Sequence, residues 1–127
     1  METLHIKHTE DVPEVILNKD DEIFEISGMS FHEDVNTFYE PVLNWIKVYT
    51  GNPNPLTVFN FKFTYFNTAT SKIILDILTM LEELDEAGNN VIVKWHFAEG
   101  DEDMLEAGEE FSEMVEVPIE LVAYRKR

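Results

Sequence analysis

The sequence predicts an α/β protein that begins with a β-hairpin and continues with alternating helices and strands. Three observations indicate this class. Residues 14–28 hold two β-prone runs around a turn-rich segment. Residues 56–66 and 91–97 each alternate between an apolar face and a mixed face, and apolar residues at helical spacing separate these strands. Strands joined through single helices favour parallel pairing, so we expect a mixed sheet of about five strands after an antiparallel first pair.

The first helix follows the hairpin, which Gly28 ends. From Asp34 onward, apolar residues recur at helical spacing up to Tyr49, and Gly51 and the prolines after it end the pattern. The strand over 56–66 comes next. One of its sides carries Thr57, Phe59, Phe61, Phe63 and Tyr65, and the other carries Leu56, Val58, Asn60, Lys62, Thr64 and Phe66.

A second helix is predicted from about 70 to 87, and Gly88 follows its end. Its inward stripe consists of Ile73, Ile74, Ile77, Leu78, Met80, Leu81 and Leu84. After the strand over 91–97, the acidic segment that starts at Gly100 predicts a third helix, with Asp101 or Asp103 near its start. We expect Met104, Leu105, Phe111 and Met114 to point inward, and residues 118–124 to form a closing strand.

The two middle strands each have one apolar face and one mixed face. The mixed faces hold Asn60, Lys62, Thr64, Lys94 and His96. A doubly wound sheet needs apolar residues on both faces. We therefore expect the helices to cover mainly one face of the sheet, in a single domain over residues 1–127.

The charge balance restricts the partners of this chain. Nine basic and 26 acidic residues give a formal net charge of −17, which argues against binding to nucleic acid or to an anionic membrane. The chain has no cysteine, so disulfides and thiolate metal sites are excluded. No apolar run approaches the roughly 20 residues that span a bilayer, and the N-terminus lacks the apolar segment of a secretory signal. A bacterial cytoplasmic protein is expected.

Catalytic and metal-binding patterns have little support. No pair among His5, His8, His32 and His96 has ligand spacing on a predicted helix. The acidic stretch over 100–110 lacks the turn glycine of a calcium loop. There is no nucleophile motif and no phosphate-binding glycine loop. We expect a protein that is not an enzyme and that uses no cofactor.

A cluster of small and polar residues lies where the strand over 56–66 passes into the second helix. It consists of Asn67, Thr68, Ala69, Thr70 and Ser71, followed by Lys72. Asn67, Thr68 or Thr70 can cap the helix. On a helical wheel, Thr68 projects onto the outward side with Lys72, Leu75, Thr79 and Glu86. An apolar residue beside hydroxyls at a helix N-terminus indicates a docking surface, where a phosphate changes binding without unfolding the domain.

The chain resembles the SiaC family of bacterial regulatory phosphoproteins. Four stretches carry the resemblance: GMSFHEDVNTFYEPVLNWIKVY, YFNTATSK, VIVKWHF and GDEDMLEAGEEF. Members look like anti-sigma-factor antagonists of the STAS type, with helices packed against a mixed sheet. The resemblance implies partner switching. A kinase of the histidine-kinase-like ATPase class phosphorylates a threonine, and a PP2C-type phosphatase reverses this. The unphosphorylated form binds and activates a diguanylate cyclase, which links the family to biofilm formation.

Within YFNTATSK, the resemblance places the phosphoacceptor at Thr68, preceded by Asn67. Ala69 stands where relatives often have a serine, which removes one competing acceptor and leaves Thr70 and Ser71 as alternatives. A second hypothesis is a small-ligand sensor that uses the mixed sheet face around Lys62, Lys94 and His96. The simpler interpretation of those lysines is cross-strand pairing with acids such as Glu25 or Glu120. A hydrolase with an acidic site has no matching motif.

Overall fold

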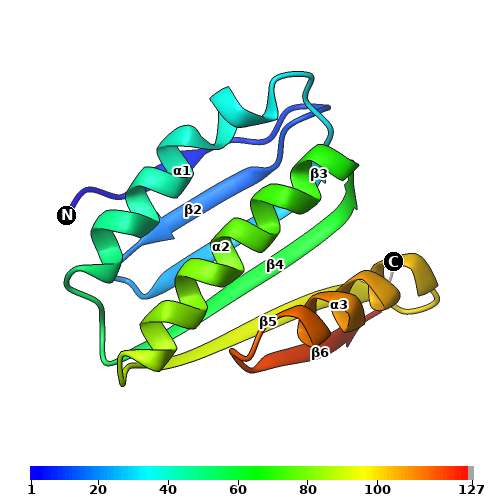
Figure 1. Cartoon of the computed structure of the whole chain (residues 1–127). Helices are drawn as coiled ribbons and strands as arrows, with labels where there is room; N and C mark the ends of the chain where they lie inside the picture. Colours follow the sequence, from blue (N-terminus) through cyan, green and yellow to red (C-terminus); the bar gives the residue numbers. More distant parts are fainter. Residues whose placement is uncertain (126–127) are drawn as a thin grey trace.

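A computed structural model describes residues 1–125 and contains a six-stranded sheet and three helices (Figure 1). The elements follow one another as β1 (Leu4–Ile6), β2 (Glu14–Asn18), β3 (Ile23–Ser30), α1 (Val35–Thr50), β4 (Leu56–Phe66), α2 (Thr68–Glu86), β5 (Asn90–Ala98), α3 (Glu102–Met114) and β6 (Ile119–Tyr124). The predicted α/β class is confirmed. The expectation of about five strands missed β1, which is too short to show alternation.

The strand order in the sheet is the order in the chain, β1-β2-β3-β4-β5-β6. The first three strands pair antiparallel, and β3 to β6 pair parallel. Because the order never reverses, right-handed crossovers place every helix on the same side. Figure 1 shows α1, α2 and α3 in one layer in front of the sheet. The prediction that helices cover mainly one face is confirmed.

The core lies between the sheet and this single helical layer. Phe59, Phe61 and Phe63 of β4 and Trp95 of β5 are each at most 1% exposed, and their rings contact one another. The inward stripe of α2 is buried as expected, apart from half-buried Met80. On α3 the expectation holds for Met104 and Phe111, which are buried. It is wrong for Met114, which is 61% exposed, and Leu105 is half-buried.

A β-bulge shifts the end of β4 by one residue. Gly28 pairs with Phe63, but the next residue, Met29, pairs with Tyr65, so Thr64 is an extra residue in β4. The shift turns Tyr65 onto the open face of the sheet, where it is 51% exposed. Phe66 instead lies on the helix-covered side and contacts Trp95 and Phe111. The predicted faces of Tyr65 and Phe66 are therefore wrong, since strict alternation holds only in an unbroken ladder.

Candidate functional site

The N-terminus of α2 is tied to the end of β3. Asn67 is the cap residue, and its side-chain oxygen accepts a hydrogen bond from the backbone N–H of Thr70 at 2.9 Å. The backbone N–H of Asn67 donates to the carbonyl of Ser30 at 3.1 Å. Of the three predicted caps, Asn67 is the one observed. The helix begins at Thr68, slightly earlier than the sequence pattern indicated.

Thr70 belongs to a buried chain of hydroxyl groups. Its side chain is fully buried and donates to Asn67 Oδ1 at 2.7 Å. The Thr70 hydroxyl also lies 2.9 Å from Ser30 Oγ, which in turn lies 2.8 Å from the Tyr39 hydroxyl. Because the Thr70 proton is directed to acceptor oxygens, Ser30 donates to Thr70 and Tyr39 donates to Ser30. Burial raises the pKa of Tyr39, which keeps this phenol protonated as the first donor.

Thr68 has the opposite environment, although it is only two residues away. Its side chain is exposed on the first turn of α2. Lys72 and Thr79 are exposed too, and Thr79 Oγ1 donates to the Leu75 carbonyl at 2.9 Å. The structure therefore brings Thr68, Lys72 and Thr79 together on the outer surface of α2, as expected. The Thr68 side chain is accessible from solvent in this fold, and the Thr70 side chain is not.

Leu75 differs from its predicted environment. It is half-buried and packs against the core, so the expectation of an apolar side chain on a fully solvated face is wrong. Ser71, one turn earlier, lines a pocket with residues of α3, and Glu82 accepts a hydrogen bond from the backbone N–H of Glu116, just after α3. Leu75 lies between these two along the helix. This stripe of α2 therefore faces α3.

Two pockets that share Phe66 and Ala107 lie beside α3, and the first of them also includes Ser71 of α2. The first has a volume of about 150 Å³ and is lined by Phe66, Ser71, Ala107, Glu110, Phe111 and Met114. The second, of about 230 Å³, is lined by Thr64, Tyr65, Phe66, Asp101, Asp103, Met104 and Ala107. Sequence reasoning missed this site, because it depends on where α3 lies and on the bulge that turns Phe66 inward.

The open face of the sheet carries the side chains on which the small-ligand sensor hypothesis depends. Some of these side chains already have partners within the protein. Lys62 Nζ lies 2.8 Å from Glu25 Oε1, which is the cross-strand pairing the sequence left open. His96 Nε2 donates to Asn60 Oδ1 at 2.8 Å. Lys94 pairs in register with Glu120. Burial, with a smaller contribution from Lys62, lowers the pKa of His96 and favours the neutral imidazole.

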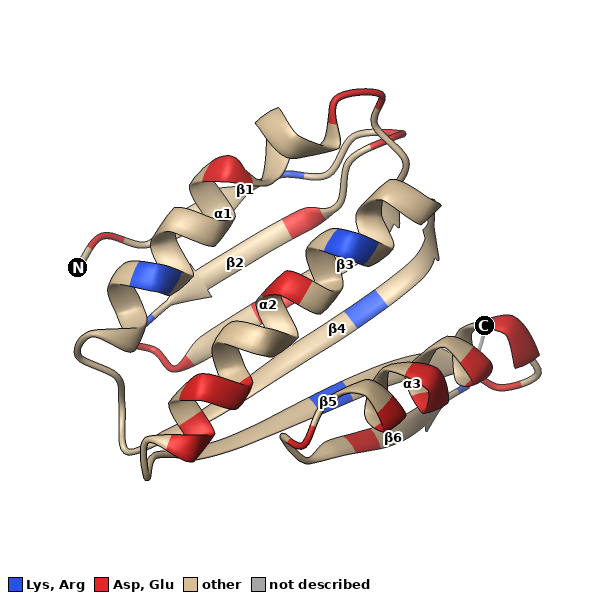
Figure 2. Ribbon diagram, in the orientation of Figure 1, with Lys and Arg blue, Asp and Glu red and all other residues tan. Residues whose placement is uncertain are grey.

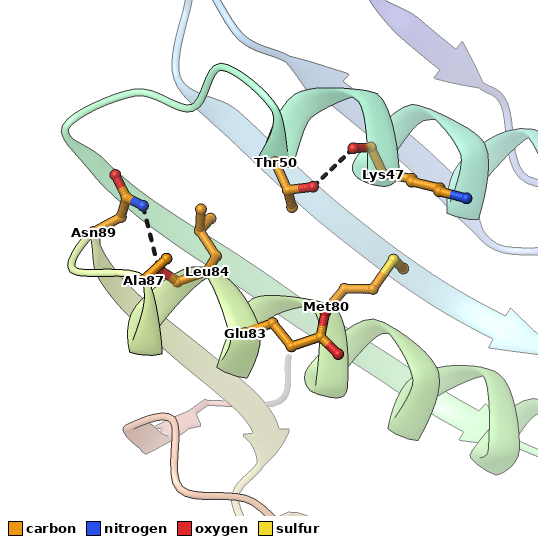
Figure 3. Close-up of a pocket in the computed structure, with 7 residues that line it drawn as sticks. All are labelled: Lys47, Thr50, Met80, Glu83, Leu84, Ala87 and Asn89. Carbon is orange, nitrogen blue, oxygen red and sulfur yellow. Dashed lines mark hydrogen bonds between the residues drawn. The ribbon is translucent and has the colours of Figure 1, made fainter.

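A further pocket lies between the C-terminal ends of α1 and α2, at the opposite end of α2 from Thr68. It measures about 430 Å³, and Figure 3 shows its lining by Lys47, Thr50, Met80, Glu83, Leu84, Ala87 and Asn89. The Thr50 hydroxyl donates to the Lys47 carbonyl, and the Asn89 amide donates to the Leu84 carbonyl. These polar groups complete the backbone hydrogen bonding at two helix ends.

Across residues 1–125, no group of three or more histidine, aspartate or glutamate side chains is arranged to hold a metal ion. Within the same range, no helix is both long enough and apolar enough to cross a membrane.

Comparison with known proteins agrees with this fold. The profile of the family described as SiaC family regulatory phosphoprotein matches residues 6–124. An uncharacterised protein of Pseudomonas aeruginosa strain UCBPP-PA14 is 27% identical over 124 residues, which cover 98% of each chain. The crystal structure of apo-SiaC from Pseudomonas aeruginosa is 26% identical, with a TM-score of 0.88 over 97% of this chain and 100% of that one.

A second solved structure contains a partner. It is the diguanylate cyclase SiaD in complex with its activator SiaC from Pseudomonas aeruginosa. The matched chain is 26% identical, with a TM-score of 0.90 over 95% of this chain and 99% of that one. The match of the family profile spans all but the ends of the sequence. The chain belongs to the SiaC family of regulatory phosphoproteins.

Proposed function

We propose that this chain is a non-enzymatic signalling protein that acts by partner switching. Unmodified at Thr68, it binds and regulates an effector such as a diguanylate cyclase, and phosphorylation of Thr68 changes that binding. The contrast between exposed Thr68 and fully buried Thr70 carries the proposal. Support comes from the related SiaC, which is the activator of SiaD in their complex. The same proposal includes a STAS-type mode of regulation, as in anti-sigma-factor antagonists, and a link to biofilm formation.

The N-terminus of α2 tolerates a phosphate at Thr68. A phosphorylated threonine carries about −1.5 to −2 charges. The first turn of a helix presents unpaired backbone N–H groups and the positive end of the helix dipole. Lys72 is one turn further along and is exposed. The modified side chain therefore gains favourable electrostatics without disturbing the buried contacts of Thr70.

A kinase of the histidine-kinase-like ATPase class and a PP2C-type phosphatase are the proposed modifying partners. Both enzymes need access to the hydroxyl, which the exposed first turn of α2 gives them. Ser71 is half-buried, and its hydroxyl donates to the Thr68 carbonyl at 2.6 Å. This engagement makes Ser71 a poorer acceptor than Thr68.

The test is incubation of the purified chain with its cognate kinase and ATP, followed by intact-mass analysis and peptide mapping. We expect a single phosphate, located at Thr68, and none on the Thr68→Ala variant. Adding the phosphatase should restore the original mass. A phosphate that maps to Thr70 or Ser71, or no phosphate at all, would contradict the proposal. The Thr70→Val variant is the matched control and should still accept one phosphate.

The sensor alternative has weaker support. Lys62 and His96 already have partners in Glu25 and Asn60, so a ligand would have to replace existing interactions.

A further inference from the structure

Thr68 is exposed, but the chain on either side of it is fixed in the core. Phe66, two residues earlier, contacts Trp95 and Phe111 on the helix-covered side of the sheet. Thr70, two residues later, has no solvent exposure. The proposed phosphoacceptor therefore lies on a short stretch of backbone that is held at both ends.

The cap of α2 differs in charge from the caps of the other two helices. Asp34 caps α1 and Asp101 caps α3, whereas Asn67 caps α2. A carboxylate accepts stronger hydrogen bonds than a neutral amide does. Among the three helices described, the one that carries Thr68 therefore begins with the weaker kind of cap.

A neutral start of α2 suits the approach of ATP. The first turn of α2 contains no acidic residue, whereas Glu102 and Asp103 lie in the first turn of α3. Figure 2 shows the same contrast between the uncharged start of α2 and the acidic positions along α3. Because ATP carries several negative charges, a carboxylate beside Thr68 would repel it. The asparagine cap avoids this repulsion, but a weaker cap needs support from elsewhere in the fold.

Hydrogen bonds from two other elements support this cap. Ser30, the last residue of β3, accepts a hydrogen bond from the Asn67 N–H at 3.1 Å, and its Oγ lies 2.9 Å from the Thr70 hydroxyl. The Tyr39 hydroxyl of α1 lies 2.8 Å from Ser30 Oγ. The three residues with these hydroxyl groups are at most 2% exposed, so water does not replace a lost partner. The position of the first turn of α2 relative to β3 and α1 therefore depends on buried hydroxyl groups.

We propose that Ser30 and Tyr39 are positioning residues for the phosphorylation of Thr68. Neither residue touches the phosphoacceptor. Both act through Thr70 and Asn67, by keeping the first turn of α2 in place. This inference rests on the proposed function, since it concerns the reaction at Thr68. It adds the buried residues on which the rate of that reaction depends.

Phosphoryl transfer is sensitive to the position of the attacking hydroxyl. Thr68 Oγ1 forms a bond to the γ-phosphorus of ATP, the bond from that phosphorus to the bridging oxygen breaks, and ADP leaves. The hydroxyl proton passes to a base of the kinase. The attacking and leaving oxygens have to lie roughly in line. A misplacement of about 1 Å lowers such a rate by as much as about 100-fold, so a fixed backbone at Thr68 favours the reaction.

Loss of the Ser30 hydroxyl leaves Thr70 Oγ1 without a hydrogen-bond donor in a site closed to water. An unsatisfied buried oxygen is unfavourable. Loosening of the first turn of α2 admits water and relieves this, and Thr68 then spends less time in line with ATP. Loss of the Tyr39 hydroxyl has a smaller effect, because Ser30 still donates to Thr70.

The experiment is single-turnover phosphorylation of the full chain, with the cognate kinase in excess and ATP at saturation. It gives the maximal rate and the kinase concentration at half-saturation. We expect Ser30→Ala to lower the maximal rate by about tenfold and Tyr39→Phe to lower it by about threefold. The half-saturating concentration should stay within about twofold, since docking of the kinase is not altered. Equal maximal rates for the parent chain and Ser30→Ala would overturn the proposal.

Tyr49→Phe separates positioning from a general loss of stability. The Tyr49 hydroxyl lies 2.7 Å from Thr57 Oγ1 and accepts a hydrogen bond from the Asn54 N–H at 3.0 Å. It is buried near the C-terminal end of α1, away from the start of α2. This variant loses at least as many hydrogen bonds as Tyr39→Phe, yet we expect its maximal rate to stay within about 1.5-fold of the parent chain. Equal rate losses in the two folded variants would overturn the positioning role.

Amide hydrogen exchange measured by NMR reports on the cap directly. The Thr70 N–H is protected by its hydrogen bond to Asn67, and the Leu78 N–H in the middle of α2 serves as the reference. We expect the ratio of the Thr70 exchange rate to the Leu78 exchange rate to rise by about fivefold in Ser30→Ala and to stay unchanged in Tyr49→Phe. An unchanged ratio in Ser30→Ala would overturn the proposal.

Failure of this inference is distinguishable from failure of the proposed function. If the parent chain accepts no phosphate from the kinase, the proposed function fails and the positioning role fails with it. If the parent chain is phosphorylated at Thr68 and Ser30→Ala reacts at the same maximal rate, the proposed function stands and only the positioning role is overturned.

Discussion

The hydroxyl of Thr70 lies 2.7 Å from the side-chain oxygen of Asn67, in a position with no solvent exposure. This contact connects the helix cap to a buried hydroxyl chain through Ser30 and Tyr39. It also distinguishes Thr70 from Thr68, which the sequence alone leaves as neighbouring candidates for modification. Thr70 is part of the buried hydrogen-bonded structure at the start of α2, whereas Thr68 is exposed to solvent.

Replacing Thr70 with valine should destabilise the fold. Valine keeps the shape of the side chain but removes the hydroxyl, which leaves Asn67 and Ser30 short of a partner in a dry site. We expect the free energy of unfolding to fall by about 1–3 kcal/mol in urea titrations followed by circular dichroism. The matched control is Thr68→Val at an exposed position, which should change it by less than about 0.5 kcal/mol. Equal losses for the two variants would contradict the buried chain.

Charge at Thr68 should weaken effector binding. Thr68→Asp places a negative charge on the exposed first turn of α2, whereas Thr68→Ala removes only the hydroxyl. We expect Thr68→Asp to reduce affinity for the cognate effector by about tenfold, or about 1.4 kcal/mol, and Thr68→Ala to bind as the unmodified chain does. Isothermal titration calorimetry measures both. Asn44→Asp on the outer face of α1 adds the same charge as a control, and a comparable loss there would show that net charge alone is responsible.

Leu75→Glu should affect both stability and binding. Leu75 is half-buried against the core and lies on the stripe of α2 that faces α3. We expect a loss of about 1–2 kcal/mol in unfolding free energy, below the range for a fully buried leucine. Effector affinity should fall as well, as measured at a temperature where the variant remains folded. Thr79→Glu, at an exposed position one turn later, should leave stability unchanged within about 0.5 kcal/mol.

Gly108→Ala should destabilise the protein even though alanine favours helices. A Cβ at Gly108 would lie 2.4 Å from Trp95 Cδ1 and 2.8 Å from Leu121 Cδ2. Trp95 is 1% exposed, and its ring N–H donates to the Met104 carbonyl at 2.9 Å. We expect a net loss of about 1–3 kcal/mol and a shift in tryptophan fluorescence. Glu109→Ala at the next, exposed position is the control, and a Gly108→Ala variant as stable as that control would contradict this close contact.

His96 should make stability depend on pH in a definite direction. Burial lowers its pKa below the ordinary value of 6.5, so the unfolded chain binds a proton more readily than the folded chain. His96 makes its full contribution to stability when the pH is above the pKa that it has in the unfolded chain. This contribution is lost as the pH falls through that pKa toward the lower pKa of His96 in the folded chain. We expect the stability of the parent chain relative to His96→Gln to decrease between about pH 7.5 and about pH 5 in urea titrations. A constant difference would contradict the lowered pKa.

The sequence predicted the elements whose patterns are local and regular. The paired runs of the hairpin, the alternation in β4 up to Phe63 and the apolar stripe of α2 were all legible without a structure. The faces of the residues at the end of β4 could not be predicted, because the bulge at Thr64 depends on the pairing of β4 with β3. The burial of Thr70 depends on Ser30 and Tyr39, which are far away in the chain.

The candidate site divides in the same way. The sequence predicted the polar cluster and its position at the start of a helix. It also limited the N-cap residue of that helix to three candidates. The two pockets beside α3 could not be predicted, since they form only when α3 packs against the end of β4 and, in the first pocket, Ser71 of α2. Met114 was expected inside for this reason: its spacing fits the apolar stripe of α3, but the helix ends there and leaves the side chain uncovered.

The sequential strand order also bears on how the chain folds as it is synthesised. Each strand pairs with the one made just before it, so the sheet grows in one direction and no earlier strand waits for a later one to be inserted between its neighbours. By the time α2 has left the ribosome, β1 to β4, the cap at Asn67 and its hydroxyl partners are all present. The helix α3 and β6 come last and cover the exposed side of β5. The N-terminus of α2 can therefore form before α3 is present beside it, and contacts between neighbouring segments favour fast folding.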